Sequence, residues 1–252
     1  MSFDVAADAY DRFMGRYSRQ LSPQLADFAG VRRGQRVLDV GCGPGALTAE
    51  LVTRLGPRSV AAVDPSDSFV AAAAERNPGV QVVLASAEEL PFPDRTFDAA
   101  LAQLVVHFMS DPVAGMVEMA RVTRQGGVIA ACVWDHAGGR GPLSLFWDAA
   151  RALDPDVEDE SRLAGAREGH LAELFEAAGL RGIETMVLAA NLEHESFDVW
   201  WEPFTHGVGP AGSYVAGLDP KRQAELRDAC RTRTGDEPFM IDARAWAARG
   251  LA

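Results

Sequence analysis

A glycine-rich loop follows the first strongly apolar run of this 252-residue chain. Residues 36–47 read RVLDVGCGPGAL, in which Gly41, Gly43 and Ala46 satisfy the spacing G-x-G-x-x-G/A. Small residues at this spacing let backbone amides approach a phosphate group closely. Asp64, at the end of the next apolar run, stands where a carboxylate can accept hydrogen bonds from ribose hydroxyls. The spacing is therefore compatible with a dinucleotide cofactor.

Asp39, two residues before the first glycine, argues against that cofactor. A carboxylate about 4 Å from a pyrophosphate charge costs on the order of 4 kcal/mol at an effective dielectric constant near 20. A ligand that carries an ammonium or sulfonium group is attracted instead. The alternative structural role for Asp39 is to cap the amides of the glycine loop, and the two roles are compatible with each other.

The segments around this loop alternate between apolar strands and alanine-rich helices. Almost wholly apolar runs are typical of strands that are covered on both faces. The strand candidates are residues 36–41, 59–64, 80–86, 97–105 and 127–135. Helices are expected from Pro44 to Gly56-Pro57, from Asp67 to residues 77–79, and from Asp111-Pro112 to Gly126-Gly127. This rhythm predicts an α/β fold with a doubly wound, mostly parallel sheet.

The rhythm changes after Asp135. Two helices, a strand near residues 183–193, a helical patch and a last strand near residues 239–250 follow. The acidic stretch 154–160, DPDVEDE, is interpreted as solvated surface in preference to a metal site. We predict a single domain over residues 1–252. Its parts are N-terminal lid helices in 1–30, a cofactor-binding core in 31–135, and in 136–252 the C-terminal half of the sheet with a substrate cap whose helices are inserted at about 196–236.

Composition limits the partners. The formal charge of −12 disfavours nucleic acid and anionic membrane surfaces. Three widely separated cysteines show neither a disulfide framework nor a zinc-ligand spacing, which favours a reducing, cytoplasmic compartment. No carboxylate and histidine set has metal-ligand spacing, so no metal is expected. The chain is expected to be a monomer or a homodimer, without a membrane span.

Four ordered landmarks then point to one family. VLDVGCGPG at 37–45, AVDPS at 62–66, AEELPFPDRTFDAA at 87–100 and EMARVTRQGG at 118–127 resemble the motifs of class I S-adenosylmethionine-dependent methyltransferases. The resemblance covers roughly residues 10–135. The cap is similar, less clearly, to that of small-molecule methyltransferases of ubiquinone and menaquinone biosynthesis. The resemblance implies a Rossmann-like seven-stranded sheet, a helical cap, and S-adenosyl-L-methionine as cofactor.

The resemblance also assigns roles to residues. Asp39 and the loop of Gly41, Gly43 and Gly45 would hold the methionine end of the cofactor, and Asp64 would accept hydrogen bonds from both ribose hydroxyls. Ser86, Ala87 and Glu88 would border the adenine, although the family usually has an acid in place of Ser86. The remaining cofactor-site candidates are Tyr10, Arg16, Pro65 and Gln103.

The expected activity is methyl transfer to oxygen, nitrogen or carbon of a small organic acceptor. His107, just beyond the fourth strand, is the candidate general base, with His136 as a second candidate. The aromatic residues predicted to line the acceptor pocket are Trp134, Trp147, Trp200, Trp201 and Phe204. Two alternatives stay open: a protein that binds the cofactor without methyl transfer, as a regulator or cyclase, and a nicotinamide-dependent oxidoreductase. The single lysine, Lys221, disfavours the latter because it leaves no Tyr-x-x-x-Lys set.

Overall fold

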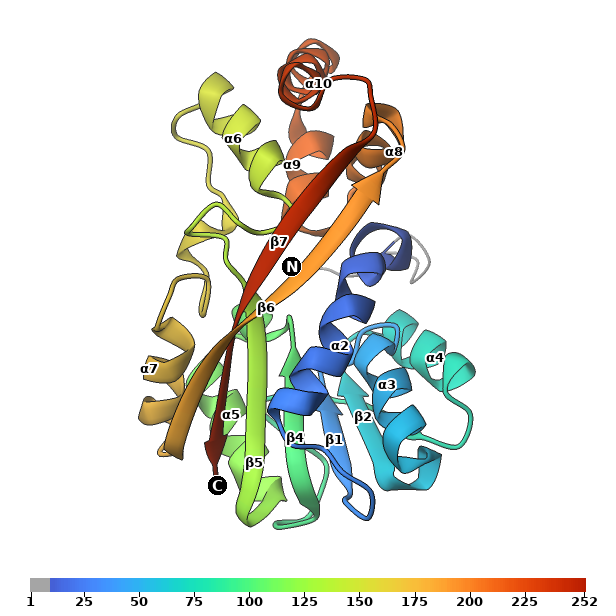
Figure 1. Cartoon of the computed structure of the whole chain (residues 1–252), viewed down its shortest axis with the longest axis vertical. Helices are drawn as coiled ribbons and strands as arrows, with labels where there is room; N and C mark the ends of the chain where they lie inside the picture. Colours follow the sequence, from blue (N-terminus) through green and yellow to red (C-terminus); the bar gives the residue numbers. More distant parts are fainter. Residues whose placement is uncertain (1–9) are drawn as a thin grey trace.

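Seven strands form one sheet in the order β3-β2-β1-β4-β5-β7-β6 (Figure 1). The computed structural model describes residues 10–252. The strands are β1 Val37–Val40, β2 Val60–Asp64, β3 Gln81–Leu84, β4 Phe97–Gln103, β5 Thr123–Trp134, β6 Arg181–His194 and β7 Phe239–Leu251. β1 to β5 pair in parallel, and β7 runs antiparallel between β5 and β6. The predicted mostly parallel, seven-stranded α/β sheet is confirmed.

The central strands are buried on both faces because helices cover both sides of the sheet. Every residue of β1 and β2 is buried. One hydrophobic cluster joins α2 (Arg16–Phe28) and α3 (Ala46–Leu55) to the sheet, and a second joins α5 (Pro112–Val122) and α7 (His170–Ala177) to the opposite face. The edge strand β6 is largely exposed, and its charged residues, such as Glu184 and Glu193, oppose strand addition.

The ends of the helices follow local chemistry. The Ser66 hydroxyl accepts a hydrogen bond from the Phe69 amide at the start of α4 (Asp67–Arg76). The Asp111 carboxylate accepts a hydrogen bond of 3.0 Å from the Ala114 amide at the start of α5. The predicted end of this helix at residues 126–127 is wrong: α5 ends at Val122, and the next residue, the β-branched Thr123, already pairs with Phe97 in the sheet. Gly126, with φ of +70°, bends the chain inside the extended segment.

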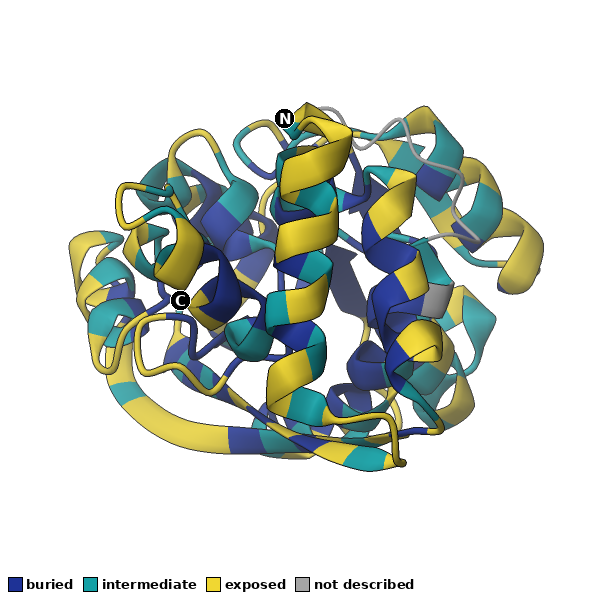
Figure 2. Ribbon diagram, turned by 90° about the horizontal axis from the view of Figure 1, so that it is seen from above, coloured by how far each residue is buried: buried dark blue, intermediate teal, exposed yellow. Residues whose placement is uncertain are grey.

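The cap lies beyond one end of the sheet. In Figure 1, β6 and β7 extend upward past the parallel strands, and helices gather around their upper ends. These helices are α6 Ser144–Leu153, α8 Phe197–Trp201, α9 Gly209–Gly217 and α10 Pro220–Thr234. Figure 2, viewed from above, shows the outermost helix, α10, exposed along most of its length, and its buried residues are Leu226 and Cys230.

Short helical turns complete the chain. They are η1 Asp11–Gly15, η2 Pro57–Ser59, η3 Val106–Phe108, η4 Glu160–Arg162 and η5 Glu202–His206. The first is a π-helix that leads into α2, and π-helical turns are frequent at functional sites. Residues 1–9 of the predicted lid lie outside the described part of the chain.

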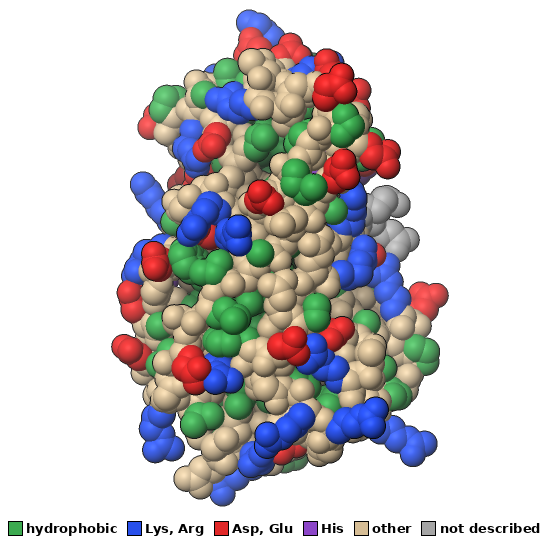
Figure 3. Space-filling view, in the orientation of Figure 1, with side chains coloured by type: hydrophobic (Ala, Val, Ile, Leu, Met, Phe, Trp, Pro, Cys, Tyr) green, Lys and Arg blue, Asp and Glu red, His purple; other side chains and the backbone are tan. Residues whose placement is uncertain are grey.

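The described surface mixes charges of both signs. Figure 3 shows acidic and basic side chains interspersed over the face that carries β6 and β7. Among residues 10–252, no helix combines the length and the apolar character that a membrane span requires.

Candidate active site

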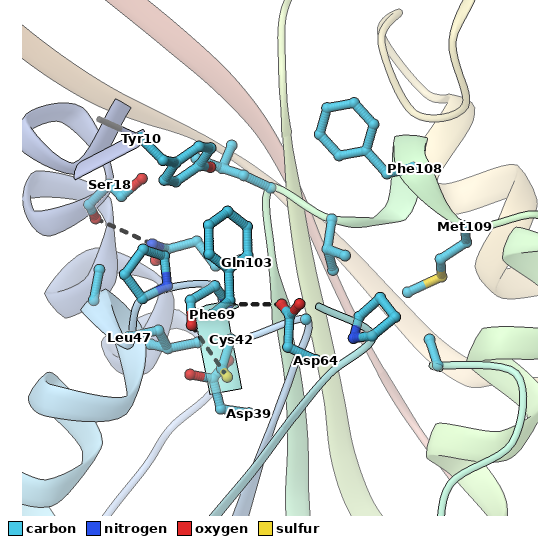
Figure 4. A pocket seen from close by; sticks show the side chains of 18 of the residues that line it. Tyr10, Ser18, Asp39, Cys42, Leu47, Asp64, Phe69, Gln103, Phe108 and Met109 are labelled. Atoms are coloured by element: carbon cyan, nitrogen blue, oxygen red, sulfur yellow. Dashed lines mark hydrogen bonds between the residues drawn. The ribbon is translucent and has the colours of Figure 1, made fainter. Parts of the chain in front are cut away.

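A cavity of about 370 Å³ lies at the carboxyl ends of β1, β2 and β4. The strand order reverses between β1 and β4, which is where doubly wound sheets bind their ligands. In Figure 4, Asp39 and Asp64 lie toward the sheet, Tyr10 lies above them, and Met109 lies on the far side. The volume falls within the range of roughly 300–1,000 Å³ that small-molecule sites occupy.

The glycine loop is shaped by close packing as well as by its backbone angles. Gly41 has φ of +67°, and a Cβ on it would lie 2.3 Å from Cγ2 of Val105. Gly45 has φ of +95°, and a Cβ there would lie 2.6 Å from Nδ2 of Asn77. Side chains at either position would separate the loop from the segments packed against it.

Asp39 is a buried carboxylate that is only half satisfied. Thr48 Oγ1 donates to Asp39 Oδ2 at 2.6 Å. Asp39 Oδ1 is buried and has no hydrogen-bond partner among the described residues, although the side chain lines the cavity. Burial raises the pKa of Asp39 to about 7, against the lowering effect of the Thr48 hydrogen bond and with a further increase from Asp64. A cationic ligand in the cavity would supply the missing donor and favour the ionised form.

Asp64 is held rigidly at the end of β2. Gly43 N donates to Oδ2 at 2.8 Å, and Ser66 N donates to Oδ1 at 2.9 Å. Burial raises the pKa of Asp64, and these two backbone bonds oppose the shift. Each oxygen keeps a second lone pair, so the oriented carboxylate can accept two hydrogen bonds from neighbouring hydroxyl groups.

The opposite wall of the cavity comes from two further segments. Ser86, Ala87 and Glu88 line it. The Glu88 carboxylate accepts hydrogen bonds from the backbone amides of Ser110 at 2.8 Å and Asp111 at 3.2 Å. These bonds connect this segment to the chain after β4. One carboxylate oxygen of Glu88, Oε1, therefore stabilises this wall of the cavity.

Gln103 connects the cavity to the N-terminal helix. Its Nε2 donates to the Ser18 carbonyl at 3.1 Å, while its Oε1 is buried without a partner among the described residues. Tyr10 and Pro65 also line the cavity. Gln103 Oε1 is therefore a second buried acceptor, besides Asp39 Oδ1, that is able to take a hydrogen bond from a ligand.

The chain after β4 carries backbone strain. Leu104 has φ of +60°, a left-handed conformation that is unusual for a residue with a branched side chain. Its amide donates to the Cys132 carbonyl at 2.9 Å, which fixes the turn. The turn leads directly into η3 and places His107 in the wall of the cavity.

A second, smaller cavity of about 40 Å³ lies on the other side of His107. Leu104, His107 and Phe108 line both cavities, and Trp134, His136 and Glu160 line the smaller one. Burial holds the pKa of His107 well below its usual value, with a further decrease from His136, and lowers the pKa of His136 to about 4. Both imidazoles are therefore neutral near pH 7.

Several predicted site residues lie elsewhere. Arg16 lines neither of these cavities and donates instead to the Glu193 carbonyl at 3.3 Å. Gly45 shapes the loop behind the cavity without lining it. Of the predicted aromatic residues, Trp134 lines the smaller cavity, whereas Phe204 stacks on Phe146 with ring centroids 4.6 Å apart in the cap core. Trp147, Trp200 and Trp201 are also buried in that core.

Glu160 is the functional candidate that the sequence did not indicate. It is 4% exposed, so the interpretation of the whole acidic stretch 154–160 as solvated surface is wrong at its last residue. Trp147 Nε1 donates to Glu160 Oε2 at 2.9 Å. Burial raises the pKa of Glu160 to about 7. No local pattern distinguishes Glu160 from the other acidic residues of the stretch, because its burial depends on how the cap folds back.

Comparison with known proteins gives a consistent result. The family described as "Methyltransferase domain" matches residues 38–131, which contain the glycine loop and both carboxylates. Demethylmenaquinone methyltransferase of Mycobacterium sp. (strain KMS) is 36% identical over 163 residues, covering 60% of this chain and 69% of that protein. The chain belongs to the class I S-adenosylmethionine-dependent methyltransferases.

Other relatives of this methyltransferase-family chain match about half of it. An uncharacterized methyltransferase of Mycobacterium tuberculosis (strain H37Rv) is 36% identical over 135 residues, covering 54% of this chain and 52% of that protein. An uncharacterized methyltransferase of Schizosaccharomyces pombe is 34% identical over 123 residues, covering 41% of this chain and 44% of that protein. The chain thus spans about half the length of these curated relatives.

Solved structures share the fold over almost the whole chain. The YcgJ protein of Bacillus subtilis superposes with a TM-score of 0.58 at 20% identity, covering 91% of this chain and 97% of that one. The [4+2]-cyclase SpnF superposes with a TM-score of 0.57 at 20% identity, covering 92% of this chain and 81% of that one. At this identity the likeness shows a shared fold, and it covers 91–92% of this chain.

Proposed function

We propose that this protein transfers a methyl group from S-adenosyl-L-methionine to a small organic acceptor. The observation that carries the proposal is the buried, half-satisfied Asp39 carboxylate in the wall of the larger cavity. It suits a ligand with a positively charged donor. It is ill suited to a pyrophosphate, because the negative charges of the two groups would repel each other at close range.

The cavity residues fit the parts of this cofactor. Asp39, with the Gly41 and Gly43 backbone, would hold the amino-acid end, and Asp64 would hold the ribose hydroxyls. Ser86 and Ala87 would border the base. When bound, the cofactor supplies an electrophilic methyl group on a positively charged sulfur atom.

The acceptor would lie on the far side of His107, where the smaller cavity begins. Alignment of two reactants can contribute roughly 7–11 kcal/mol to the rate, so holding the acceptor and excluding water is the main task of the chain. Phe13, Trp134 and Leu143 provide apolar walls for this task. His107 is buried and neutral near pH 7, so an imidazole nitrogen is unprotonated. Its lowered pKa makes it a weak base, so it would take the proton of an acceptor hydroxyl or amine as methyl transfer makes that proton acidic.

The proposal has a direct test. Purified protein is incubated with S-adenosyl-L-methionine labelled in the methyl group and with a small-molecule extract of the source organism, and labelled products are separated. The proposal predicts label in a low-molecular-weight product and formation of S-adenosylhomocysteine. Cofactor binding without label transfer would favour the regulator or cyclase alternative, and tight binding of NAD with no S-adenosylmethionine signal would favour the oxidoreductase.

Location and partners belong to the same proposal. The three cysteines are free and buried, which suits a reducing cytoplasmic compartment. The formal charge of −12 favours a small-molecule partner over nucleic acid. We propose that the protein works as a monomer or homodimer.

A further inference from the structure

Three buried, chemically reactive side chains converge on the smaller cavity. His107 is in η3 after β4, His136 follows the end of β5, and Glu160 begins η4 in the cap. One potential ligand atom from each of the three lies within 4.8 Å of the others. Their exposed fractions are 7%, 9% and 4%.

The three side chains face one another without bonding. His136 Nδ1 is 4.0 Å from Glu160 Oε2, which is too far for a hydrogen bond. His107 Nδ1 and His136 Nε2 are buried and have no hydrogen-bond partner in the described part of the chain. Polar groups buried in this way normally have partners, so each imidazole keeps a nitrogen that is able to bind a further group.

We propose that His107, His136 and Glu160 bind a divalent transition-metal ion of the Zn²⁺ or Fe²⁺ class. Two imidazoles and one carboxylate form a ligand set that such ions prefer, and Mg²⁺ or Ca²⁺ would require more oxygen ligands. The cavity of about 40 Å³ that the three residues line exceeds the space of roughly 10–15 Å³ that one water molecule needs.

The geometry requires only a small contraction. Ligand atoms about 2.1 Å from a common ion lie roughly 3.0–3.4 Å apart. The three candidate atoms lie within 4.8 Å of one another, so they must approach by at most about 1.5 Å. Rotation of the side chains can supply this. The Glu160 carboxylate is already oriented by the indole of Trp147, which is the kind of supporting hydrogen bond that positions metal ligands.

The position of the site defines its role. His107 lines both cavities, so the ion would lie at the boundary between the proposed cofactor site and the proposed acceptor site. Three protein ligands leave coordination positions open, which suits an acceptor that offers an oxygen or nitrogen atom. With the ion bound, His107 is a ligand and no longer the proton acceptor. This role, though not the ion site itself, rests on the proposed function.

The site can be tested by titrating full-length, tag-free protein with Co²⁺ after dialysis against a chelator. We expect one equivalent of Co²⁺ to produce visible absorption and to be displaced by Zn²⁺. His136→Gln and Glu160→Gln should each weaken binding by roughly 100-fold or more, since losing a supporting residue alone costs 10–100-fold. Glu160→Gln retains an oxygen that can accept from Trp147 Nε1.

Two matched controls distinguish this site from adventitious binding. His194→Gln removes another buried histidine, whose Nε2 bonds to the Tyr17 hydroxyl, and His206→Gln breaks an exposed pair with Glu202. Both should bind Co²⁺ as the wild type does. Absence of stoichiometric binding, or equal affinity in the His136 and Glu160 variants, would overturn the proposal. So would loss of binding in His206→Gln.

Folding and the proposed function are monitored separately. Circular dichroism melts identify a variant that fails to fold, in which case His107→Gln replaces it. Binding of S-adenosylhomocysteine to the same samples is measured without metal. Metal binding without S-adenosylhomocysteine binding would contradict the proposed function alone, and the reverse result would contradict the metal site alone.

Discussion

The two ends of the active-site region are built in different ways. At the sheet end, Asp39, Gly41 and Gly43 come from one short segment, and Asp64 ends the neighbouring strand. At the cap end, His107, His136 and Glu160 come from three separate segments that only the completed fold brings together. The sheet end therefore leaves a local pattern in the sequence, whereas the cap end depends on tertiary structure.

The largest expected effect is on turnover in a His107 variant, and it distinguishes catalysis at the cap end from cofactor binding at the sheet end. His107→Ala should lower kcat by roughly 10²–10⁴-fold, because a proton acceptor or a ligand at the acceptor side is lost. The dissociation constant for S-adenosylhomocysteine should stay within about 2-fold of the wild-type value, since the cofactor contacts are proposed for the other side of the cavity. Turnover and calorimetric binding of the same preparation measure both quantities. A large loss of cofactor affinity would mean that His107 also binds the cofactor, which would contradict the separation of the two ends.

A glycine pair tests the construction of the sheet end. Gly41→Ala introduces a Cβ 2.3 Å from Val105 at a positive φ, whereas Gly43→Ala has a positive φ but no atom within 4 Å of the new Cβ. Left-handed strain costs about 1 kcal/mol, and overpacking adds about 1–3 kcal/mol. Urea denaturation should show Gly41→Ala to be less stable than Gly43→Ala by about 1–3 kcal/mol. Equal stability would mean that the loop and Val105 separate easily.

Asp39 should give a pH signature in the stability of the cofactor-free protein. Its pKa rises from 3.8 to about 7 on folding, so the folded state favours the protonated acid. The cofactor-free protein should therefore lose stability as the pH rises from about 4 to about 7, by up to about 4 kcal/mol, with the loss complete above pH 7. Asp39→Asn removes this dependence and should melt roughly 10 °C higher than the wild type at pH 8.

Cofactor affinity should respond to pH in the opposite sense. A cationic ligand needs the ionised carboxylate, so wild-type affinity should fall as the pH drops below about 7, and Asp39→Asn should show no such fall. At pH 8 the variant should bind roughly 10-fold more weakly, which corresponds to one charge-assisted hydrogen bond. Identical pH profiles for the two proteins would remove Asp39 from the binding site.

The sequence predicted the fold well because its signals are local. Apolar runs marked the parallel strands, and caps such as Asp111 and the glycine after α3 marked helix ends. The expectation that all these strands are covered on both faces is wrong at β3, an edge strand whose residues are exposed or only partly buried. A second exception was the end of α5, where pairing of Thr123 with the sheet replaced the expected last turn. A strand partner distant in sequence decided that boundary.

The cap end of the site could not be predicted in the same way. Glu160 lies in an acidic stretch whose other residues are at least partly exposed, and its burial arises from contact with Trp147. Arg16 was expected near the cofactor, but its position on α2 directs it to the Glu193 carbonyl of β6. Which aromatic residues would line a cavity and which would fill the cap core also depended on packing, as Phe204 on Phe146 illustrates.

Calorimetric titration with S-adenosylhomocysteine tests the central claim most directly. Wild type, Asp64→Ala and the exposed control Asp67→Ala are compared. Asp64 is proposed to accept two charge-assisted hydrogen bonds, each contributing about 1.5–3 kcal/mol, so Asp64→Ala should weaken binding by at least about 100-fold. Asp67→Ala should match the wild type. An unchanged dissociation constant in Asp64→Ala, or no binding to the wild type, would contradict the proposed cofactor site.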